Sequence, residues 1–382
     1  MITRDEILAW LRVTDETGLE ELWREADRVR HERVGDEVHL RGLVEFSNHC
    51  ARLCGYCGLR RDNRELGRYR MTSDEILVCA HDAVRFGYGT VVLQSGEDFG
   101  ATAEWVAEVV RQIKSETPLA VTLSLGERRE PELLLWRHAG ADRYLLRFET
   151  SNEQLYDRIH PPLPGVRSDR IALLRRLREI GYEVGSGVMV GIPGQSWDDL
   201  ANDIEMFRHL DLDMIGVGPY IPHPATPLGR VMAGGETPPV TGKGRGPAED
   251  SRSSELEPER LALLPPNEQV PNDELTTLKA VALTRLVCPH SNIPSTTALA
   301  TIDRDHGREL GLMRGANIVM PNLTPPEYRL GYEIYPGKAC INETAEMCHG
   351  CLAGRIQSIG RSIGAGRGDS PALQGRTTER DS

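Results

Sequence analysis

The amino-acid sequence predicts an α/β protein built as a (β/α)8 TIM-type barrel, with a helical extension before the barrel and a cysteine-containing segment after it. Short apolar runs typical of strands alternate with longer amphipathic patterns typical of helices, the order expected of a parallel sheet. The length of 382 residues suits such a barrel with insertions. Active sites of these barrels lie at the C-terminal ends of the strands, so polar residues that follow strands are the candidate functional residues.

The elements follow one another along the chain as repeated strand and helix units. Strands are expected at residues 38–46, 90–94, 120–125, 143–148, 184–190, 214–217, 291–296 and 316–320. Helices are expected between them at residues 74–85, 103–114, 170–180, 197–209, 273–287 and 305–313. Eight strand and helix units are what a closed barrel requires.

Composition divides the chain around this barrel. Residues 1–37 form the helical extension, and the barrel is expected in residues 38–232 and 272–338. Residues 233–271 read as a disordered surface insertion, because 12 of these 39 residues are Pro or Gly. Residues 339–360 hold a group of cysteines, and the Gly- and Arg-rich residues 361–382 are expected to be a flexible tail.

Charge and hydropathy exclude several classes of partner. The net charge of −12 argues against a nucleic-acid-binding surface. The chain has no apolar run of about 18 residues that could span a membrane. The charged N-terminus does not resemble a signal peptide, so we expect a cytoplasmic protein whose cysteines stay reduced.

Three closely spaced cysteines are the strongest chemical signal in the chain. Cys50, Cys54 and Cys57 have the spacing CX3CX2C and are expected on a loop after the first strand. Thiolates at such spacing suit an iron–sulfur cluster or zinc. A structural zinc site usually has four closed ligands, so a single triplet favours a [4Fe–4S] cluster with one iron left open.

Polar residues are also frequent where the barrel would place its site. A polar group that faces the interior of a barrel needs a hydrogen-bonding partner, which a ligand can supply. These residues are Gln94, Ser95 and Glu97 at the second strand, Thr122 and Ser124 on the third, and Arg147 and Glu149 at the end of the fourth. Their clustering predicts a ligand-binding cavity.

A second cysteine triplet follows the last predicted strand. Cys340, Cys348 and Cys351 have the spacing CX7CX2C, and intracellular cysteines at such spacing usually bind a metal. We therefore predict an auxiliary iron–sulfur cluster. The alternative is three unrelated thiols, and the neighbouring His349 is more simply explained as a bystander than as a fourth ligand.

The first triplet, with Tyr56 before its last cysteine, resembles the radical S-adenosylmethionine (SAM) superfamily. Within it, the chain from residue 43 to residue 359, apart from the insertion, resembles the [FeFe]-hydrogenase maturase HydE family, a relative of biotin synthase and methylornithine synthase. The matching segments are residues 93–98, 121–127, 144–150, 188–195, 216–224, 292–298 and 319–322. This resemblance implies a [4Fe–4S] cluster on the first triplet and SAM bound to its open iron.

The resemblance also implies roles for individual residues. Reduction of the cluster would cleave SAM to a 5′-deoxyadenosyl radical. The residues that match SAM-binding positions are Tyr56, Ser95, Glu97, Glu149, Arg170 and Met214. Arg170 would hold the SAM carboxylate, and Met214 would lie near the sulfonium unless it is an ordinary core methionine.

A small organometallic substrate is the further implication, namely a cysteine-bound Fe(CO)2(CN) complex. The residues that would line its cavity are Gln94, Thr122, Ser124, Arg147, Thr296, Thr297, Met320 and Tyr335. The implied partners are the other maturases, which are a tyrosine lyase and a scaffold GTPase, and an electron donor such as flavodoxin or ferredoxin. The second triplet would bind a [2Fe–2S] or [4Fe–4S] cluster that is dispensable for activity.

Two alternatives remain open at this point. The chain could be a radical SAM enzyme that acts on a small organic substrate, as biotin synthase and methylornithine synthase do. It could also be a non-catalytic iron–sulfur carrier, which would need no SAM pocket. Glu97, Glu149 and Arg170 argue against the carrier.

Overall fold

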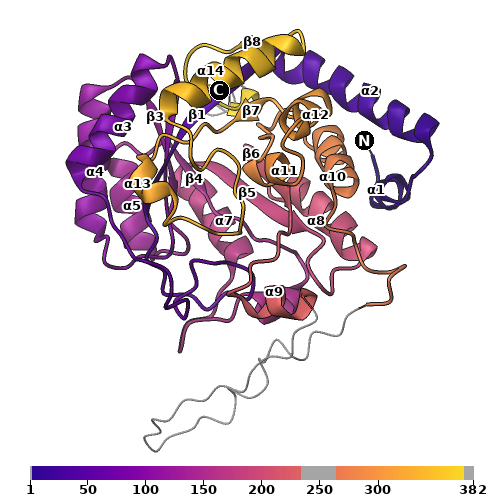
Figure 1. Cartoon of the computed structure of the whole chain (residues 1–382), viewed down its shortest axis with the longest axis horizontal. Helices are drawn as coiled ribbons and strands as arrows, with labels where there is room; N and C mark the ends of the chain where they lie inside the picture. The colour runs from indigo at the N-terminus through magenta and orange to yellow at the C-terminus, as the bar shows by residue number, and fades with distance from the viewer. Residues whose placement is uncertain (1, 234–263, 374–382) are drawn as a thin grey trace, which may run out of the picture.

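The computed structural model describes residues 2–233 and 264–373, and its centre is a curved parallel sheet surrounded by helices (Figure 1). The strands lie side by side in the order β6-β5-β4-β3-β2-β1-β7. They are β1 (Glu37–Ser47), β2 (Thr90–Ser95), β3 (Ala120–Ser124), β4 (Arg143–Leu145), β5 (Glu183–Val190), β6 (Met214–Pro219) and β7 (Ile318–Val319). The predicted α/β barrel class is confirmed.

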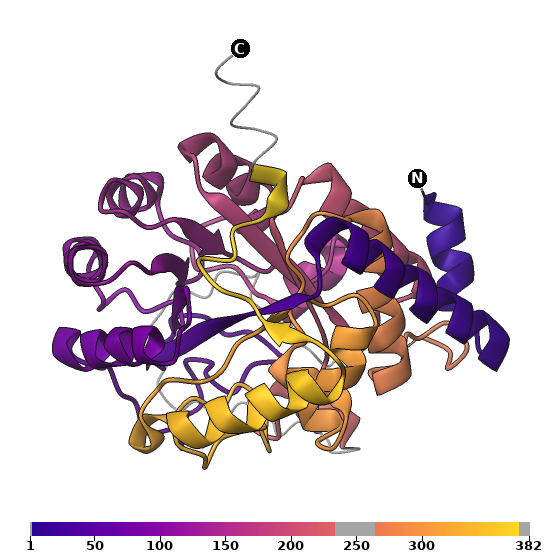
Figure 2. The ribbon, with the colours of Figure 1, turned by 90° about the horizontal axis from the view of Figure 1, so that it is seen from above.

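Helices precede the sheet and cover its outer face (Figure 2). They are α1 (Arg4–Leu11), α2 (Glu16–Val34), α3 (Ser73–Arg85), α4 (Ala103–Glu116), α5 (Glu130–His138), α6 (Glu153–Ile159), α7 (Arg170–Ile180), α8 (Trp197–His209), α9 (Pro227–Met232), α10 (Glu274–Val287), α11 (Thr297–Ile302), α12 (Gly307–Met313), α13 (Pro326–Arg329) and α14 (Ala345–Ser358). Capping boxes begin α3 at Thr72 and α8 at Ser196. Among the described residues, no helix is long and apolar enough to cross a membrane.

The predicted seventh strand, residues 291–296, is not a regular strand. This segment closes the sheet between β6 and β7 only through isolated bridges, Met214 with Asn292 and Pro294 with Ile318. Pro294 has no N–H group to donate to a neighbouring strand, which explains why regular pairing stops there. β4 is likewise shorter than predicted, at three residues.

Alternation along the strands separates the two faces of the sheet. Val91, Leu93, Val121 and Leu123 belong to the apolar core between sheet and helices. Their neighbours in the sequence point to the opposite side, because successive side chains of a strand alternate. The barrel interior therefore receives the polar residues, which are Gln94 on β2 and Thr122 and Ser124 on β3.

The segment after α14 packs against the sheet, which differs from the flexible tail expected for residues 361–382. β8 (Ser362–Ile363) pairs with the start of β1. The following residues run across the N-terminal ends of the strands (Figure 2). There Arg41 Nη2 donates to Gly368 O (2.8 Å), and Thr90 Oγ1 donates to Arg367 O (2.8 Å). Buried side chains thus satisfy the backbone of a Gly-rich segment; residues 374–382 lie outside the described residues.

The predicted insertion, residues 233–271, is described only in part, because residues 234–263 lie outside the described residues. Its last residues pack on the loop that joins β5 to α8. Gly194 N donates to Gln269 Oε1 (2.8 Å), and Val270 N donates to Gln195 O (2.9 Å). This end of the predicted insertion is therefore part of the barrel.

Arg143 should be essential for stability at the base of the barrel. Its side chain is 0% exposed and pairs with Glu183, which is 4% exposed, and with Asp369. Arg143→Met leaves a buried carboxylate without its partner, so we expect a loss of about 3–5 kcal/mol in the free energy of unfolding. Urea denaturation measures this loss.

The matched control is Arg176→Met, which removes an exposed arginine that pairs with Glu130 and Glu179 on the surface. We expect that change to cost less than about 1 kcal/mol. Equal losses in the two variants would contradict the role assigned to Arg143.

Candidate functional site

The loop that carries the first cysteine triplet follows β1 at its C-terminal end. Arg68 shapes this loop, because its guanidinium donates to the carbonyls of Asn48, Leu59, Arg60 and Asn63. Neighbouring elements hold the loop as well. Ala51 N donates to the carbonyl of Glu97 (3.0 Å), and Gly55 N donates to that of Ile159 (2.7 Å). The cysteines are therefore fixed against the ends of β2 and α6.

The three thiols lie close enough to influence one another. Burial and the neighbouring thiols of Cys50 and Cys57 raise the pKa of Cys54 well above its ordinary value. Burial, followed by the effect of Cys50, raises the pKa of Cys57 to about 12. A metal cation bound among these thiols would offset the repulsion between their thiolate charges, and its binding would release their protons.

Gly96 allows the loop to approach β2. A Cβ atom at this position would lie 2.4 Å from His49 O and 2.8 Å from Cys50 Cβ, which is too close for any side chain. Ser95 and Glu97 flank this glycine, and Ala51 N contacts the Glu97 carbonyl. Gly96 thus allows the cysteine loop to pack directly against the end of β2.

A buried ion-pair cluster of two arginines and two glutamates lies beside the thiols. Arg52 Nε contacts Glu97 Oε2 at 2.5 Å, and its Nη2 contacts Glu127 Oε2 at 3.1 Å. Arg170 Nε contacts Glu127 Oε1 at 2.9 Å, and its Nη2 lies 3.6 Å from Glu97 Oε1. The ion-pair cluster joins the cysteine loop, the ends of β2 and β3, and α7.

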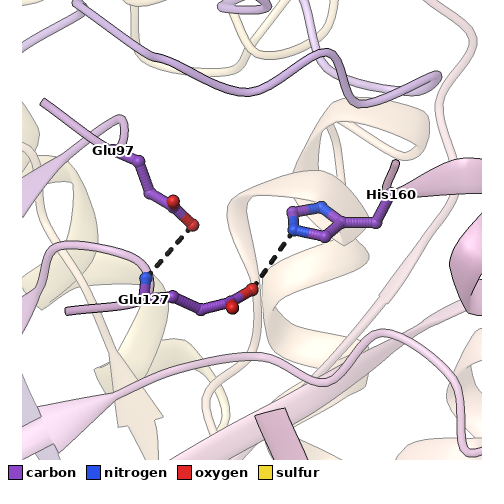
Figure 3. Close-up of side chains that lie close together, drawn as sticks. All are labelled: Glu97, Glu127 and His160. Atoms are coloured by element: carbon purple, nitrogen blue, oxygen red, sulfur yellow. Dashed lines mark hydrogen bonds and ion pairs between the residues drawn. The ribbon is translucent and has the colours of Figure 1, made fainter. Parts of the chain in front are cut away.

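His160 completes this arrangement, and Figure 3 shows its ring facing Glu127. Its Nδ1 lies 3.0 Å from Cys54 Sγ, and its Nε2 lies 3.0 Å from Arg170 Nη2 and 3.3 Å from Glu127 Oε1. Burial and the charge of Arg170 lower the pKa of His160 to about 3. Glu97, Glu127 and His160 are close enough together to hold a metal ion, but two arginines already balance both carboxylates.

Glu149 follows β4 in a left-handed backbone conformation, with φ of 64°, which is uncommon for a residue other than glycine. Its carboxylate accepts from Arg147 Nε (3.1 Å). Burial raises the pKa of Tyr56, and Glu149 contributes to this shift, so the two side chains lie near each other. Glu149 lies just beyond the C-terminal end of β4, and its predicted contact with the cofactor stays a prediction.

The carboxylate of Asp203, on α8, stabilises the turn at Glu149 through hydrogen bonds. This carboxylate is fully buried and accepts from Thr150 Oγ1 (3.2 Å), Ser151 Oγ (2.7 Å) and Gln195 Nε2 (3.0 Å). Burial raises its pKa to about 7. Asp203 thus ties the loop after β4 to the loop after β5, and nothing in the helical pattern of the sequence distinguished it.

The barrel interior combines open space with an unpaired hydroxyl. Thr122 Oγ1 is buried and has no hydrogen-bond partner among the described residues. A Cβ atom at Gly216, on β6, would meet no atom closer than 3.9 Å. Gln94 Nε2 donates to Tyr332 OH (3.3 Å), and Arg147 Nη2 donates to Val188 O. Polar residues on β2 and β3 and after β4 therefore lie around the barrel interior, which has local space beside Gly216.

The remaining predicted cavity residues lie at the opposite edge of the sheet. Thr296 caps α11 by accepting from Leu299 N, and Thr297 is the first residue of that helix. Met320 directly follows β7. Burial raises the pKa of Tyr335, and its hydroxyl is hydrogen-bonded to Thr301.

Glu45 and Lys338 form a buried ion pair that the sequence analysis missed. Their side chains are 1% and 5% exposed. Glu45 Oε2 also accepts from Asn322 Nδ2 (2.9 Å), and Lys338 Nζ lies 5.3 Å from the centre of the Tyr332 ring. Glu45 could have been found, because it is a charged residue within an apolar strand. Lys338 could not, because it lies in a loop without a pattern.

The prediction that Met214 contacts the cofactor sulfonium is wrong. Met214 is the first residue of β6, at the N-terminal end of the strand, and its Sδ accepts from Arg41 Nη1 (2.6 Å). The cysteine loop lies at the opposite end of the strands. Met214 is therefore a packing residue at the base of the barrel.

The second triplet surrounds a separate cavity of about 160 Å³. Cys348 is buried, Cys340 is half-buried and Cys351 is exposed. A hydrogen bond from Cys348 and the nearby Arg308 lower the pKa of Cys340 to about 6. His349 points elsewhere, because its ring stacks on Phe86 at 5.0 Å. The structure brings these three cysteines together at α14.

Comparison with known proteins agrees with this geometry. The Radical SAM superfamily profile matches residues 44–207. The chain is 43% identical to [FeFe] hydrogenase maturase subunit HydE of Thermotoga maritima, over 95% of this chain and 92% of that protein. It is 28% identical to 3-methylornithine synthase of Methanosarcina barkeri, over 86% of this chain and 81% of the relative.

A crystal structure of methylornithine synthase (PylB) covers 95% of this chain and 94% of its own, with a TM-score of 0.74 at 24% identity. That likeness concerns the fold. The sequence identity to HydE extends over nearly the whole chain. The chain therefore belongs to the radical SAM superfamily and, within it, to the HydE family of [FeFe]-hydrogenase maturases.

Proposed function

We propose that this enzyme acts in assembly of the [FeFe]-hydrogenase active site, on a small cysteine-bound Fe(CO)2(CN) precursor inside the barrel. One observation carries the proposal. The cysteine triplet, the ion-pair cluster and the inward polar side chains all meet at the C-terminal ends of the strands. This arrangement supports a radical source at the mouth of the barrel that acts on a small molecule, the kind of ligand that barrel sites bind.

The residues of the site fit the cofactors that the family requires. Cys50, Cys54 and Cys57 would hold a [4Fe–4S] cluster, since one buried and two half-buried thiols on a single loop supply soft sulfur ligands. The close packing of Gly96 against His49 and Cys50 keeps the cysteine loop beside Ser95 and Glu97, the residues proposed to contact SAM. The reduced cluster, when bound, cleaves SAM to a 5′-deoxyadenosyl radical.

The protein's own side chains would orient SAM through its charged ends. The residues proposed to contact it are Tyr56, Ser95, Glu97, Glu149 and Arg170. The contact of Arg170 Nη2 with Glu97 Oε1 is the longest in the ion-pair cluster, at 3.6 Å. Arg170 can therefore release this edge to a ligand carboxylate, while Glu97 turns towards a ligand ammonium.

An anionic substrate would match the interior beneath SAM. Arg147 supplies a positive charge there, and Thr122 supplies a buried hydroxyl that has no partner among the described residues. Carboxylate and cyanide groups, as in the proposed precursor, accept hydrogen bonds of this kind. The proposed cavity also includes Gln94, Ser124, Thr296, Thr297, Met320 and Tyr335.

The second triplet would hold an auxiliary [2Fe–2S] or [4Fe–4S] cluster. Its cavity lies at α14, on a different part of the molecule from the cysteine loop. We further propose that the enzyme works in the cytoplasm with a tyrosine lyase, a scaffold GTPase and a flavodoxin or ferredoxin that donates electrons.

The test of this function is anaerobic reconstitution with iron and sulfide, followed by reduction in the presence of SAM. We expect a new electron paramagnetic resonance (EPR) signal only when the cysteine-bound Fe(CO)2(CN) complex is added. If the rate of 5′-deoxyadenosine formation is the same with and without this complex, the result would favour the alternative, a small organic substrate such as those of the methylornithine and biotin synthases.

Cys54→Ala should prevent cluster assembly at the first triplet. Cys54 is the most buried of the three thiols, and an alanine supplies no ligand. We expect 5′-deoxyadenosine formation to fall to background. Cys288→Ala, which removes a buried core thiol, is the matched control and should retain turnover. Undiminished turnover in Cys54→Ala would refute the cluster assignment.

Replacing Cys340, Cys348 and Cys351 together by serine should leave SAM cleavage largely intact. The iron content per chain should fall, because only the auxiliary site is lost. Iron analysis and the 5′-deoxyadenosine assay on the same sample measure both effects. Loss of SAM cleavage with the first cluster still present would show that the second triplet is not auxiliary.

A further inference from the structure

His160 contacts both a cysteine of the first triplet and the arginine beside it. The residue follows α6, and its side chain is 1% exposed. Its backbone N donates to Tyr156 O (2.8 Å), and the Tyr156 ring packs 5.0 Å from the imidazole. The preceding carbonyl, of Ile159, accepts from Gly55 N in the cysteine loop. The ring is therefore fixed in place on several sides.

Donor and acceptor chemistry fixes the proton of this imidazole once Cys54 is a metal ligand. A metal-bound thiolate can only accept a hydrogen bond, so Nδ1, 3.0 Å from Cys54 Sγ, must carry the proton. Neutral imidazole has one N–H group, which leaves Nε2 as an acceptor. Arg170 Nη2, 3.0 Å away, can only donate and complements it.

The nearby Glu127 carboxylate does not compete for this arrangement. Its Oε1 lies 3.3 Å from His160 Nε2. The same oxygen already accepts from Arg170 Nε (2.9 Å) and from Ser168 Oγ (2.6 Å). Glu127 therefore keeps these two hydrogen bonds when the imidazole proton of His160 is on Nδ1, facing Cys54.

We propose that His160 is a positioning residue that donates to the Cys54 sulfur and accepts from Arg170, so that one imidazole couples the cluster to the SAM site. This inference rests on the proposed function, because it needs a cluster on the first triplet and SAM at Arg170. Hydrogen bonds to ligand sulfurs are among the factors that set the reduction potential of iron–sulfur clusters. The Arg170 contact fixes the guanidinium that receives the SAM carboxylate.

Three substitutions separate the two hydrogen bonds. His160→Phe keeps the ring volume and removes both. His160→Asn places an amide near the position of Nδ1 and falls short of Arg170. His160→Gln extends to the position of Nε2 and withdraws its amide from Cys54. The matched control is His223→Asn, which removes a buried histidine whose Nδ1 accepts from Ala225 N.

The readouts are the midpoint reduction potential of the reconstituted cluster, followed by EPR, and the dissociation constant of SAM. His160→Phe should shift the potential to a more negative value and weaken SAM binding by about tenfold or more. His160→Asn should retain the potential but weaken SAM binding, and His160→Gln should do the reverse. His223→Asn should change neither.

An unchanged potential in His160→Phe would overturn the inference, as would equal effects of Asn and Gln on both quantities. Should His160→Phe take up no iron, the Asn and Gln variants decide the matter in the same way. The wild-type protein provides the separate check on the proposed function. A wild-type chain that holds no cluster or binds no SAM would refute that function, whereas normal loading with insensitive variants would refute only the role of His160.

Discussion

The arrangement of the site depends on the buried ion-pair cluster formed by Arg52, Glu97, Glu127 and Arg170. Each of these residues comes from a different segment, namely the cysteine loop, the ends of β2 and β3, and the start of α7. A buried ion pair adds little net stability, because desolvation offsets the attraction, but leaving one charge unpaired costs about 3–5 kcal/mol. Any displacement of one segment therefore requires the others to follow. The pairing of these four charges therefore fixes the cysteine loop relative to the ends of β2 and β3 and to the start of α7.

The turn at Glu149 shows how the fold supports a strained residue. A left-handed conformation outside glycine costs on the order of 1–3 kcal/mol, and here the next residues, Thr150 and Ser151, donate hydrogen bonds to the buried Asp203. Asp203 also accepts from Gln195, whose own side-chain oxygen accepts from Gly191 N (2.8 Å). A single carboxylate on α8 thus aligns two loops of the site. Through Asp203, helix α8 on the outside of the barrel therefore helps to position the loops at the C-terminal ends of the strands.

The sequence predicted the features that depend on local pattern. The position of Gln94, Thr122 and Ser124 on predicted strands indicated them as candidates for the barrel interior, and cysteine spacing indicated both thiol groups. Features that depend on tertiary contacts were missed. His160 has no partner at ligand spacing along the chain, and the Gly-rich segment after residue 360 packs because buried arginines bind its backbone carbonyls and Asp369. The prediction for Met214 was wrong because this residue is the first of β6 and lies at the N-terminal end of the strand. Residue type alone does not tell at which end of a strand a side chain lies.

The C-terminal segment limits the route by which ligands can enter and leave the barrel. Residues 366–370 bind inward-facing residues at the base, including Thr90 and Arg143, and a Cβ atom at Gly89 would lie 1.7 Å from Gly366 O. The barrel therefore has a floor, and its mouth is the face on which SAM is proposed to bind. Under the proposed function, a substrate bound between this floor and SAM would enter before SAM and leave after the SAM fragments. The floor would thereby impose an order of addition and release on the catalytic cycle.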